Sequence, residues 1–174
     1  MCARTASTSS GVMSVTPWSA AACPATWAKM PSSSAAEKWA LQPLYNLMER
    51  EAYEAELRDV VAEHGLGALP YFGLARGFLT GKYRAGEQID SPRAKGAAQY
   101  VGEKGDRVLG ALGDAAQEHG VPVAAVALRW LADQPTVVAP IASGRSVDQL
   151  ADLLPMLDLV LTDDERQRLT DASA

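Results

Sequence analysis

The residues best suited to chemistry lie between Thr136 and Leu150, in the sequence TVVAPIASGRSVDQL. An apolar run rich in β-branched residues, Thr136–Ile141, predicts a buried strand of a parallel sheet, covered on both faces. Small residues and Arg145 follow, and Ser146 with Gln149 after it has the pattern of a capped helix start. Free N–H groups of a first helical turn, the helix dipole and an arginine all favour an anion. The spacing predicts a phosphate site, and an ordinary strand-to-helix turn is the alternative.

Length, composition and charge bound the class of protein. The chain has 174 residues, 48% of them hydrophobic, and a net charge of −5, which predicts one globular domain with its own core. An acidic surface argues against nucleic acid or an anionic membrane as the main partner. No apolar run reaches the roughly 18 residues of a membrane span. With only Cys2 and Cys23, both near the N-terminus, the chain is expected in a reducing, cytoplasmic setting.

Residues 1–36 differ in composition from the rest of the chain. Ala and Ser dominate, Arg4 and Lys29 are the only charged residues, and no helical or strand period is sustained. We expect an irregular or disordered N-terminal segment. A secretory signal would need a compact apolar core. A segment created by a shifted reading frame or a wrong start site is a third interpretation, and the composition changes abruptly at Glu37, where the second region, 37–174, begins.

Hydrophobic periodicity predicts strands alternating with helices in this second region. Short apolar segments predict strands at Trp39–Gln42 and Leu66–Tyr71, on either side of a helix over Glu49–Gly65. A glycine-rich stretch to about Gly102 predicts a lid or binding loop. Further helices are predicted at Asp106–His119, from Pro122, from Ser146, and from Thr162, where Glu165 completes a capping box. This order implies an α/β fold with parallel strands and right-handed crossovers.

Three strands cannot close a barrel, because a full (β/α)8 barrel needs eight strands and about 250 residues. The pattern therefore predicts either a small open sheet or one part of a larger barrel. Such a sheet leaves two edges unpaired, so we expect a homo-oligomer through the exposed sheet edges, or an aggregation-prone chain.

Four stretches taken together resemble the aldo/keto reductase family. They are LQPLYNLMER at 41–50, YFGLARGFLTGKYR at 71–84, VAAVALRWLADQP at 123–135 and VAPIASGRSVDQL at 138–150. The resemblance covers the chain from about Ala40 onward. It implies an α/β fold that is a partial TIM (β/α)8 barrel, about the last three strands with their helices. It also implies NADPH-dependent reduction of a small-molecule carbonyl substrate to an alcohol.

The resemblance implies roles for several residues in binding NADPH. Gln42 matches a glutamine that hydrogen-bonds the nicotinamide carboxamide, and an amide offers donor and acceptor together. Tyr45 lies near the position of an aromatic ring that stacks on the nicotinamide, with core packing as the alternative. Gly73, Leu74 and Gly77 fall in the turn that wraps the pyrophosphate.

The resemblance places the adenosine end of the cofactor on the stretch described first. Ser143, Gly144 and Arg145 match the loop that holds the adenosine phosphates, and Gln149 matches a residue placed against the adenine. Arg145 would contact the 2′-phosphate, which favours NADPH over NADH. Leu153 departs from the family, which commonly has an asparagine there, and this implies a weaker adenine site.

Two further features depart from the family pattern. Phe72 stands where the family commonly has the serine of the pyrophosphate turn, so a hydroxyl contact is lost. The catalytic Asp, Tyr, Lys and His have no counterpart, since residues 1–36 contain no Asp, His or Tyr. The two histidines, His64 and His119, each precede a helix-ending glycine and are expected to cap helices.

We therefore expect a truncated aldo/keto reductase that is inactive by itself, with no metal site and no catalytic residue of its own. A non-catalytic NADP-binding or regulatory module, and a fragment without function, remain open as alternatives. The substrate is not identified by the sequence.

Overall fold

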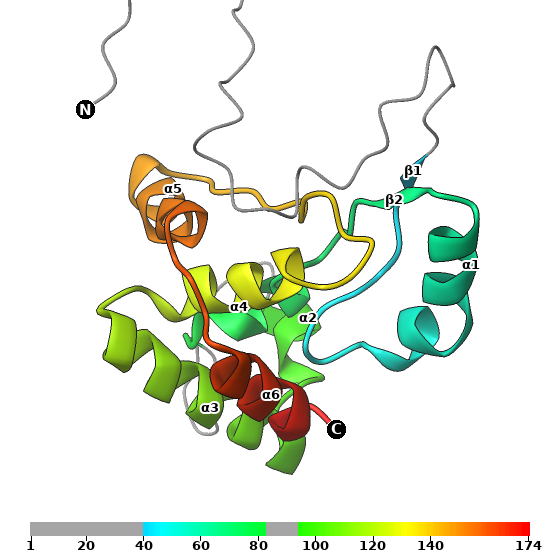
Figure 1. The fold of residues 1–174 in the computed structure, drawn as a ribbon. Helices are drawn as coiled ribbons and strands as arrows, with labels where there is room; N and C mark the ends of the chain where they lie inside the picture. Colours follow the sequence, from blue (N-terminus) through cyan, green and yellow to red (C-terminus); the bar gives the residue numbers. More distant parts are fainter. Residues whose placement is uncertain (1–39, 83–93) are drawn as a thin grey trace, which may run out of the picture. The chain divides into compact units, whose positions relative to one another are not determined.

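The computed structural model describes residues 40–82 and 94–174 (Figure 1). The predicted N-terminal segment, residues 1–36, lies outside these described residues. The described chain is an α/β fold in which helices predominate and two short strands pair in parallel. The elements are β1 Ala40–Leu41, η2 Tyr53–Leu57, α1 Arg58–Glu63, β2 Gly67–Ala68, η3 Ala75–Thr80, α2 Ala94–Ala98, α3 Glu103–His119, α4 Val123–Ala132, α5 Val147–Leu153, η4 Leu154–Leu157 and α6 Asp163–Ala172.

The predicted third strand lies beside β2, on the side away from β1. Ala68 of β2 donates its N–H to the carbonyl oxygen of Thr136 at 2.8 Å and accepts from the N–H of Val138 at 2.9 Å. Ala68 therefore forms a parallel bridge with Val137. All three predicted strand segments are thus parallel neighbours, with β2 between β1 and the third segment.

The third segment nevertheless differs from the buried strand that the sequence predicts. Val137 is its only buried residue, and both Ala139 and Ile141 are exposed. Pro140 has no N–H group to donate to a neighbouring strand. Within the described chain this segment is an edge, with a single bridge to β2, so it is covered on fewer sides than the central strand of a parallel sheet.

The predicted helices form close to their expected bounds. α3 ends at Gly120 as predicted, and the φ of 63° there is a left-handed conformation that glycine adopts readily. Pro122 is the N-cap of α4 rather than its first helical residue, so this helix begins one position later than predicted. Thr162 and Glu165 form the predicted capping box of α6, with both reciprocal hydrogen bonds present.

The glycine-rich stretch predicted as a long loop carries two short helices, η3 and α2. Both α2 and α4 contact η3, so this part of the stretch packs against the rest of the fold. Residues 83–93, in the middle of the same stretch, lie outside the described chain.

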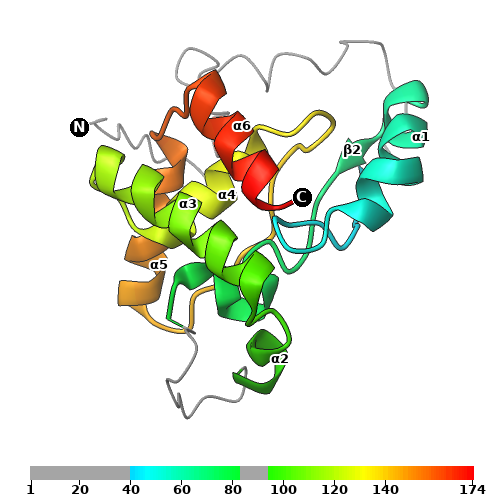
Figure 2. The ribbon, with the colours of Figure 1, turned by 90° about the horizontal axis from the view of Figure 1, so that it is seen from below.

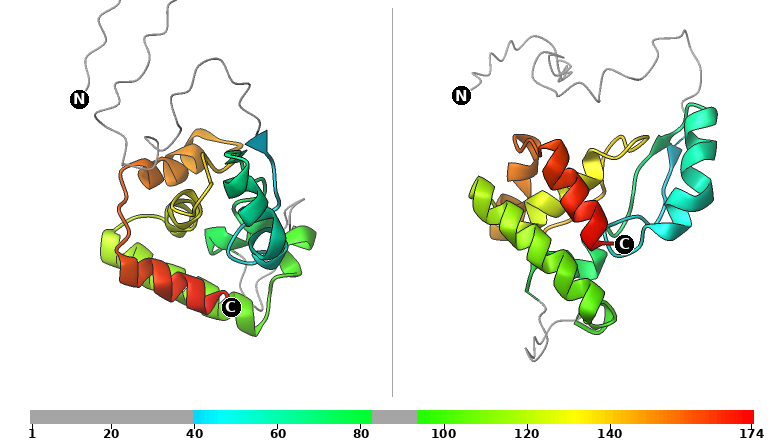
Figure 3. Two further views of the ribbon diagram at one scale, coloured as in Figure 1. Left: turned by 45° about the vertical axis from the view of Figure 1, so that its right-hand side comes forward. Right: turned by 60° about the horizontal axis from the view of Figure 1, so that its bottom comes forward.

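α4 lies at the centre of the described fold (Figures 1 and 3). All residues from Ala124 to Leu131 are buried, so every face of this helix is covered. α3, α5, η3 and η4 all contact α4, and a helix that is apolar apart from Arg129 needs such an enclosure. No helix of the described chain combines the length and the apolar character needed to cross a lipid bilayer.

A partly buried arginine, Arg50, joins the start of η2 to the end of α6. Its guanidinium makes a bidentate pair with Glu54 at 2.8 and 2.9 Å. It also donates to the carbonyl oxygen of Thr170 at 2.6 Å and to Ser173 Oγ at 2.8 Å, and lies 5.6 Å from the centre of the Trp130 ring. The fixed fork of the guanidinium therefore connects three helices at once.

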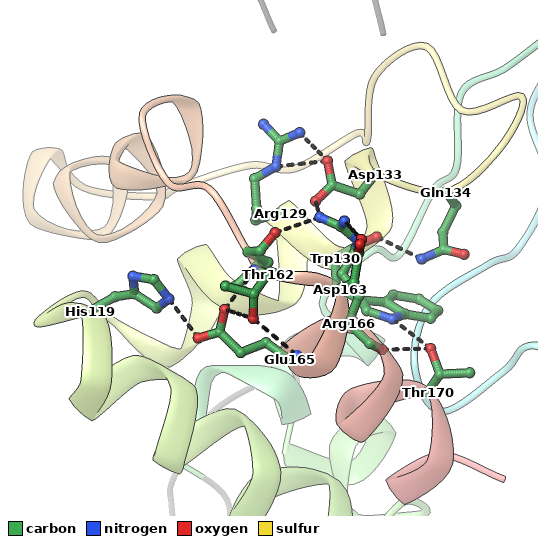
Figure 4. Close-up of polar contacts among 11 residues, drawn as sticks. His119, Arg129, Trp130, Asp133, Gln134, Thr162, Asp163, Glu165, Arg166 and Thr170 are labelled. Carbon is green, nitrogen blue, oxygen red and sulfur yellow. Dashed lines mark hydrogen bonds and ion pairs between the residues drawn. The ribbon is translucent and has the colours of Figure 1, made fainter. Parts of the chain in front are cut away.

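A second polar network connects α4 with α6 (Figure 4). Arg129 pairs with Asp133 just past the end of α4, and Arg166 of α6 lies 3.5 Å from the other oxygen of the same carboxylate. Trp130 Nε1 donates to Thr170 Oγ1 at 3.1 Å. Because Arg129 and Asp133 are largely buried, removal of Asp133 would leave the charge of Arg129 uncompensated in the interior, whereas removal of Arg129 would leave Asp133 paired with Arg166.

Glu165 of α6 is buried against α3, which runs alongside α6 (Figure 2). Thr162 donates to its carboxylate from the backbone N–H at 2.6 Å and from the hydroxyl at 2.7 Å, and His119 Nε2 lies 2.6 Å from the other oxygen. Burial by itself would raise the pKa of Glu165, but these hydrogen bonds outweigh it and lower the pKa to about 2. His119, expected only to cap its helix, thus links α3 to α6.

Replacing Gly105 by Ala is expected to destabilise the fold. A Cβ atom at Gly105 would lie 2.2 Å from the carbonyl oxygen of Tyr100 and 2.7 Å from Cζ of Phe78, so α3 would have to move. We expect the free energy of unfolding, measured by urea denaturation, to fall by about 2 kcal/mol. Gly113→Ala in the same helix is the control, because a Cβ there meets nothing within 4 Å. It should be neutral or stabilise by up to about 1 kcal/mol, and equal losses in the two variants would contradict the prediction.

The low pKa of Glu165 predicts a pH dependence of stability. A carboxyl whose pKa falls from 4.5 to about 2 on folding stabilises the fold above about pH 4.5 and loses this contribution as the pH falls toward 2. The full contribution of this pKa shift to the free energy of unfolding is on the order of 3 kcal/mol. Glu165→Gln should therefore lose stability at neutral pH and show a flatter stability profile in acid than the parent. Urea titrations across this range measure both, with the exposed Asp164→Asn as control. Parallel profiles for parent and Glu165→Gln would refute the assignment.

Candidate functional site

Three parallel segments of the chain end side by side at one edge of the fold. Tyr71, after β2, donates its N–H to the carbonyl oxygen of Pro43, after β1, at 3.0 Å. Ile141, in the third segment, donates to the carbonyl oxygen of Pro70 at 2.8 Å. These bonds place the loops that follow the three segments next to one another. We call the region formed by the loops that follow Leu41, Ala68 and Ile141 the carboxyl edge. In parallel sheets, ligands bind at the carboxyl ends of the strands.

Three residues that the sequence analysis predicts to bind the cofactor, from three separate parts of the chain, follow these segments. Gln42 is the exposed residue directly after β1, Gly73 lies in the turn after β2, and Arg145 lies in the loop after the third segment. The exposed amide of Gln42 can donate and accept hydrogen bonds at once. The structure thus brings the loops of these predicted residues to the carboxyl edge.

Tyr45 belongs to the core rather than to the exposed part of this edge. It is 1% exposed, and its ring centre lies 4.7 Å from that of Tyr53 and 6.0 Å from that of Trp130. Its hydroxyl donates to Glu54 at 2.7 Å. Burial raises the pKa of Tyr45 and the Glu54 carboxylate raises it further, so the hydroxyl remains a donor. Of the two roles that the sequence leaves open for Tyr45, this environment serves core packing, because a buried ring has no face to offer a ligand.

An exposed aromatic ring is present at the carboxyl edge in Tyr71, which sequence reasoning missed. Its side chain is 38% exposed, and its ring meets that of Phe72 edge-on, with the centres 5.2 Å apart. A signal for Tyr71 exists in the sequence, since it ends the predicted strand Leu66–Tyr71 just as Gln42 ends the first one. Side chains at the carboxyl ends of parallel strands are the ones that face a ligand.

The turn after β2 is wound in the left-handed conformation at several residues. They are Phe72 with φ 53°, Ala75 with φ 46°, Arg76 with φ 58° and Gly77 with φ 99°. Residues other than glycine adopt this conformation at an energetic cost, and such strain is common at functional sites. Gly73, within the turn, lies against α4, because a Cβ atom there would be 3.0 Å from Cδ2 of Leu131. Leu74 beside it is half-buried.

A cation lies over the aromatic ring of this turn. Arg76 is exposed, and its guanidinium carbon is 4.4 Å from the centre of the Phe72 ring. Phe72 occupies the position where the resemblance leads us to expect a serine. The turn therefore presents a positive charge stacked on a phenyl ring in place of a hydroxyl, an arrangement that the residue pattern alone does not reveal.

Ser143, Gly144 and Arg145 form an exposed loop that leads into α5. The predicted N-cap is present, since Ser146 Oγ accepts from the N–H of Gln149 at 3.2 Å. In a complete capping box the side chain of Gln149 would accept from the N–H of the N-cap, Ser146. Here Gln149 Oε1 instead accepts from the N–H of Arg145, one residue before the N-cap, at 2.9 Å. The backbone of Arg145 is therefore fixed on the first turn of the helix.

Close packing in this loop requires glycine at one position. A Cβ atom at Gly144 would lie 3.0 Å from the backbone nitrogen of Leu150, so a side chain there would push the loop off α5. Arg145, the next residue, is exposed and forms no ion pair with any residue of the described chain. Its charge is available to an external anion.

The donor groups of the carboxyl edge suit phosphate groups. Arg145 contributes a guanidinium and Ser143 a hydroxyl, whereas the N–H of Gln149 in the first turn of α5 already donates to Ser146 Oγ. Asp148 in that first turn carries the opposite charge and weakens the attraction. No group of three His, Cys, Asp or Glu side chains in residues 40–82 and 94–174 is placed to hold a metal ion.

Most of the chain matches a known family model, described as the aldo/keto reductase family, over residues 18–174. The match thus begins within residues 1–36, the segment whose composition differs from the rest of the chain. Among curated relatives, the "Probable voltage-gated potassium channel subunit beta" of Oryza sativa is 30% identical over 126 residues, which cover 68% of this chain and 38% of that protein. L-Glyceraldehyde 3-phosphate reductase of Escherichia coli K12 is 30% identical over 124 residues, which cover 67% and 36%.

Solved structures agree with this result. A glycerol dehydrogenase from Gluconobacter oxydans superposes with a TM-score of 0.63 at 27% identity, covering 76% of this chain and 41% of that one. The chain therefore spans less than half the length of the proteins that it matches. A family match that extends over residues 18–174 establishes that this chain belongs to the aldo/keto reductase family.

Proposed function

We propose that the carboxyl edge binds NADPH. The observation that carries the proposal is the pair of backbone hydrogen bonds, Tyr71 to Pro43 and Ile141 to Pro70, which align the loops after three parallel segments. In this proposal Gln42 bonds the nicotinamide carboxamide at one end of the cofactor. Membership of a family of oxidoreductases supports this assignment, as do the relatives named as a reductase and a dehydrogenase.

The remaining parts of the cofactor are assigned to the other two loops. The turn containing Gly73, Leu74 and Gly77 would face the pyrophosphate with its backbone. The loop of Ser143, Gly144 and Arg145, whose donor groups suit phosphate, would hold the adenosine phosphates, with Gln149 near the adenine.

The aromatic contact with the nicotinamide is assigned differently from the sequence-based expectation. We propose Tyr71 for this role instead of Tyr45, because Tyr71 has an exposed ring at the carboxyl edge and Tyr45 is enclosed by the core. Stacking on an aromatic face needs an accessible ring, which only the first of these two tyrosines provides.

For the whole protein we propose reduction of a small-molecule carbonyl compound to an alcohol, with NADPH supplying the hydride. The described residues would form about the last three strands of a TIM barrel, together with their helices. Their contribution is to bind and orient the cofactor. We assign no proton donor to the described chain, so the 174-residue chain is expected to bind NADPH without turnover.

Replacing Arg145 by Ala should weaken NADPH binding about 10- to 100-fold, because a charge-assisted hydrogen bond to the 2′-phosphate is lost. Binding of NADH, which lacks that phosphate, should change by less than about twofold. Fluorescence titration of both nucleotides measures the two effects. Arg168→Ala is the control, since it removes the same charge from an exposed position of α6. Equal losses for NADPH and NADH would count against the assignment of Arg145.

The purified chain should not oxidise NADPH in the presence of a generic aldehyde, although it binds the nucleotide. Absorbance at the nicotinamide band follows turnover, with a complete aldo/keto reductase as the positive control. Steady NADPH oxidation that depends on the aldehyde would show that the chain carries a proton donor, contrary to this proposal.

A second candidate function is a non-catalytic NADP-binding or regulatory module. The relative named as a potassium channel subunit beta favours it, and association of copies through the outer edges of the sheet would accompany it. Nucleotide binding without turnover fits both candidates, whereas the absence of nucleotide binding would remove both.

A further inference from the structure

Asn46 is a buried polar residue in the loop after β1, with 1% of its surface exposed. A buried amide destabilises a fold unless its polar atoms are hydrogen-bonded. Its Oδ1 accepts from the N–H groups of Met48 at 2.8 Å and Glu49 at 3.1 Å. Its Nδ2 donates to Glu49 Oε2 at 3.3 Å and to the carbonyl oxygen of Phe72 at 3.1 Å. Two donors and two acceptor positions are all filled, and the two N–H groups fix the orientation of the amide.

The bond to Phe72 joins two loops that are distant in sequence. Asn46 follows β1, whereas Phe72 is the first left-handed residue of the turn after β2. The carbonyl oxygen of Phe72 also accepts from the N–H of Ala75 at 2.7 Å, which closes the turn. Asn46 and Ala75 therefore bond the same oxygen at the point where the strained backbone begins. Strained backbone persists only where surrounding contacts hold it.

Packing restrains the same turn from a second direction. Gly73 lies so close to α4 that a Cβ atom would be 3.0 Å from Leu131 and 3.3 Å from Leu128. The turn thus rests on α4, while the amide of Asn46 holds its first carbonyl group from the neighbouring loop. Together the two contacts fix where the backbone N–H groups of the turn point.

We propose that Asn46 is a positioning residue for cofactor binding, which holds the turn Phe72–Gly77 in the shape that faces the pyrophosphate. This inference rests on the proposed NADPH site. Since Asn46 is buried, it acts through the turn and touches no ligand. Its loss should therefore affect the pyrophosphate part of the site and spare the adenosine end at Arg145.

Asn46→Asp separates the two functions of this side chain, which are to accept from the loop after β1 and to donate to the turn after β2. It keeps the oxygen that accepts from Met48 and Glu49, and it replaces the NH2 donor to Phe72 by an oxygen. In the ligand-free full chain, amide hydrogen exchange at residues 73–77 should accelerate at least about fivefold, with Met48 and Glu49 unchanged. The affinity for NADPH should fall at least about fivefold, whereas that for adenosine 2′,5′-bisphosphate, which has no pyrophosphate, should stay within about twofold.

Glu49→Gln is the matched control, because it removes the carboxylate beside Asn46 and leaves the bond to Phe72. It should leave both affinities within about twofold. The double variant Asn46→Asp/Glu49→Gln removes the repulsion between the two carboxylates and should still behave like Asn46→Asp. If Asn46→Asp does not fold, Asn46→Ser takes its place, because a serine hydroxyl is too short to reach Phe72.

Exchange at residues 73–77 that matches the parent, or equal loss of affinity for both ligands, would overturn the proposal. The failure of the proposed function is a different result. In that case the parent chain would bind neither NADPH nor adenosine 2′,5′-bisphosphate, and the exchange measurement alone would decide whether Asn46 holds the turn.

Discussion

Burial of α4 on every side is the constraint on which the rest of the structure depends. Apart from Arg129, the residues of α4 are apolar, and apolar residues on several faces of a helix are stable only when other elements cover them. Here α3, α5, η3 and η4 do so, and the turn after β2 rests on Leu131 and Leu128. The turn after β2, at the carboxyl edge, therefore also helps to enclose α4. A change in the packing of this helix would move the turn after β2 as well.

Polar groups tie the periphery of this core together. Arg50 links the first helix, Trp130 and the end of α6, while Arg129, Asp133 and Arg166 join α4 to α6. Each of these charged groups has a partner, which is what a low-dielectric interior requires. Asn46 follows the same rule with a neutral amide. Because its four hydrogen bonds involve two separate loops, satisfying one buried group also joins the loop after β1 to the turn after β2.

Much of the fold follows from short stretches of sequence. Thr162 and Glu165, three residues apart, form the capping box of α6, and Gly120 ends α3. Both features depend only on residues close together in the chain, so they can be predicted from a short stretch of sequence. The family resemblance is likewise carried by four linear motifs and is confirmed by the match over residues 18–174. Capping boxes and helix-ending glycines can be read from the sequence because the contacts that they make are between residues near one another in the chain.

The tertiary structure alone decided which side of each loop faces the core. Tyr45 and Tyr71 both lie where a strand ends, yet the first is enclosed by Tyr53 and Trp130 and the second is exposed. The left-handed turn at Phe72 and its bond to Asn46 have no local signature either. By itself, the sequence determined the family, the longer helices and the alternation of strands and helices along the chain. Burial and strain depend on residues distant in the chain that meet only after folding, so no linear pattern specifies them.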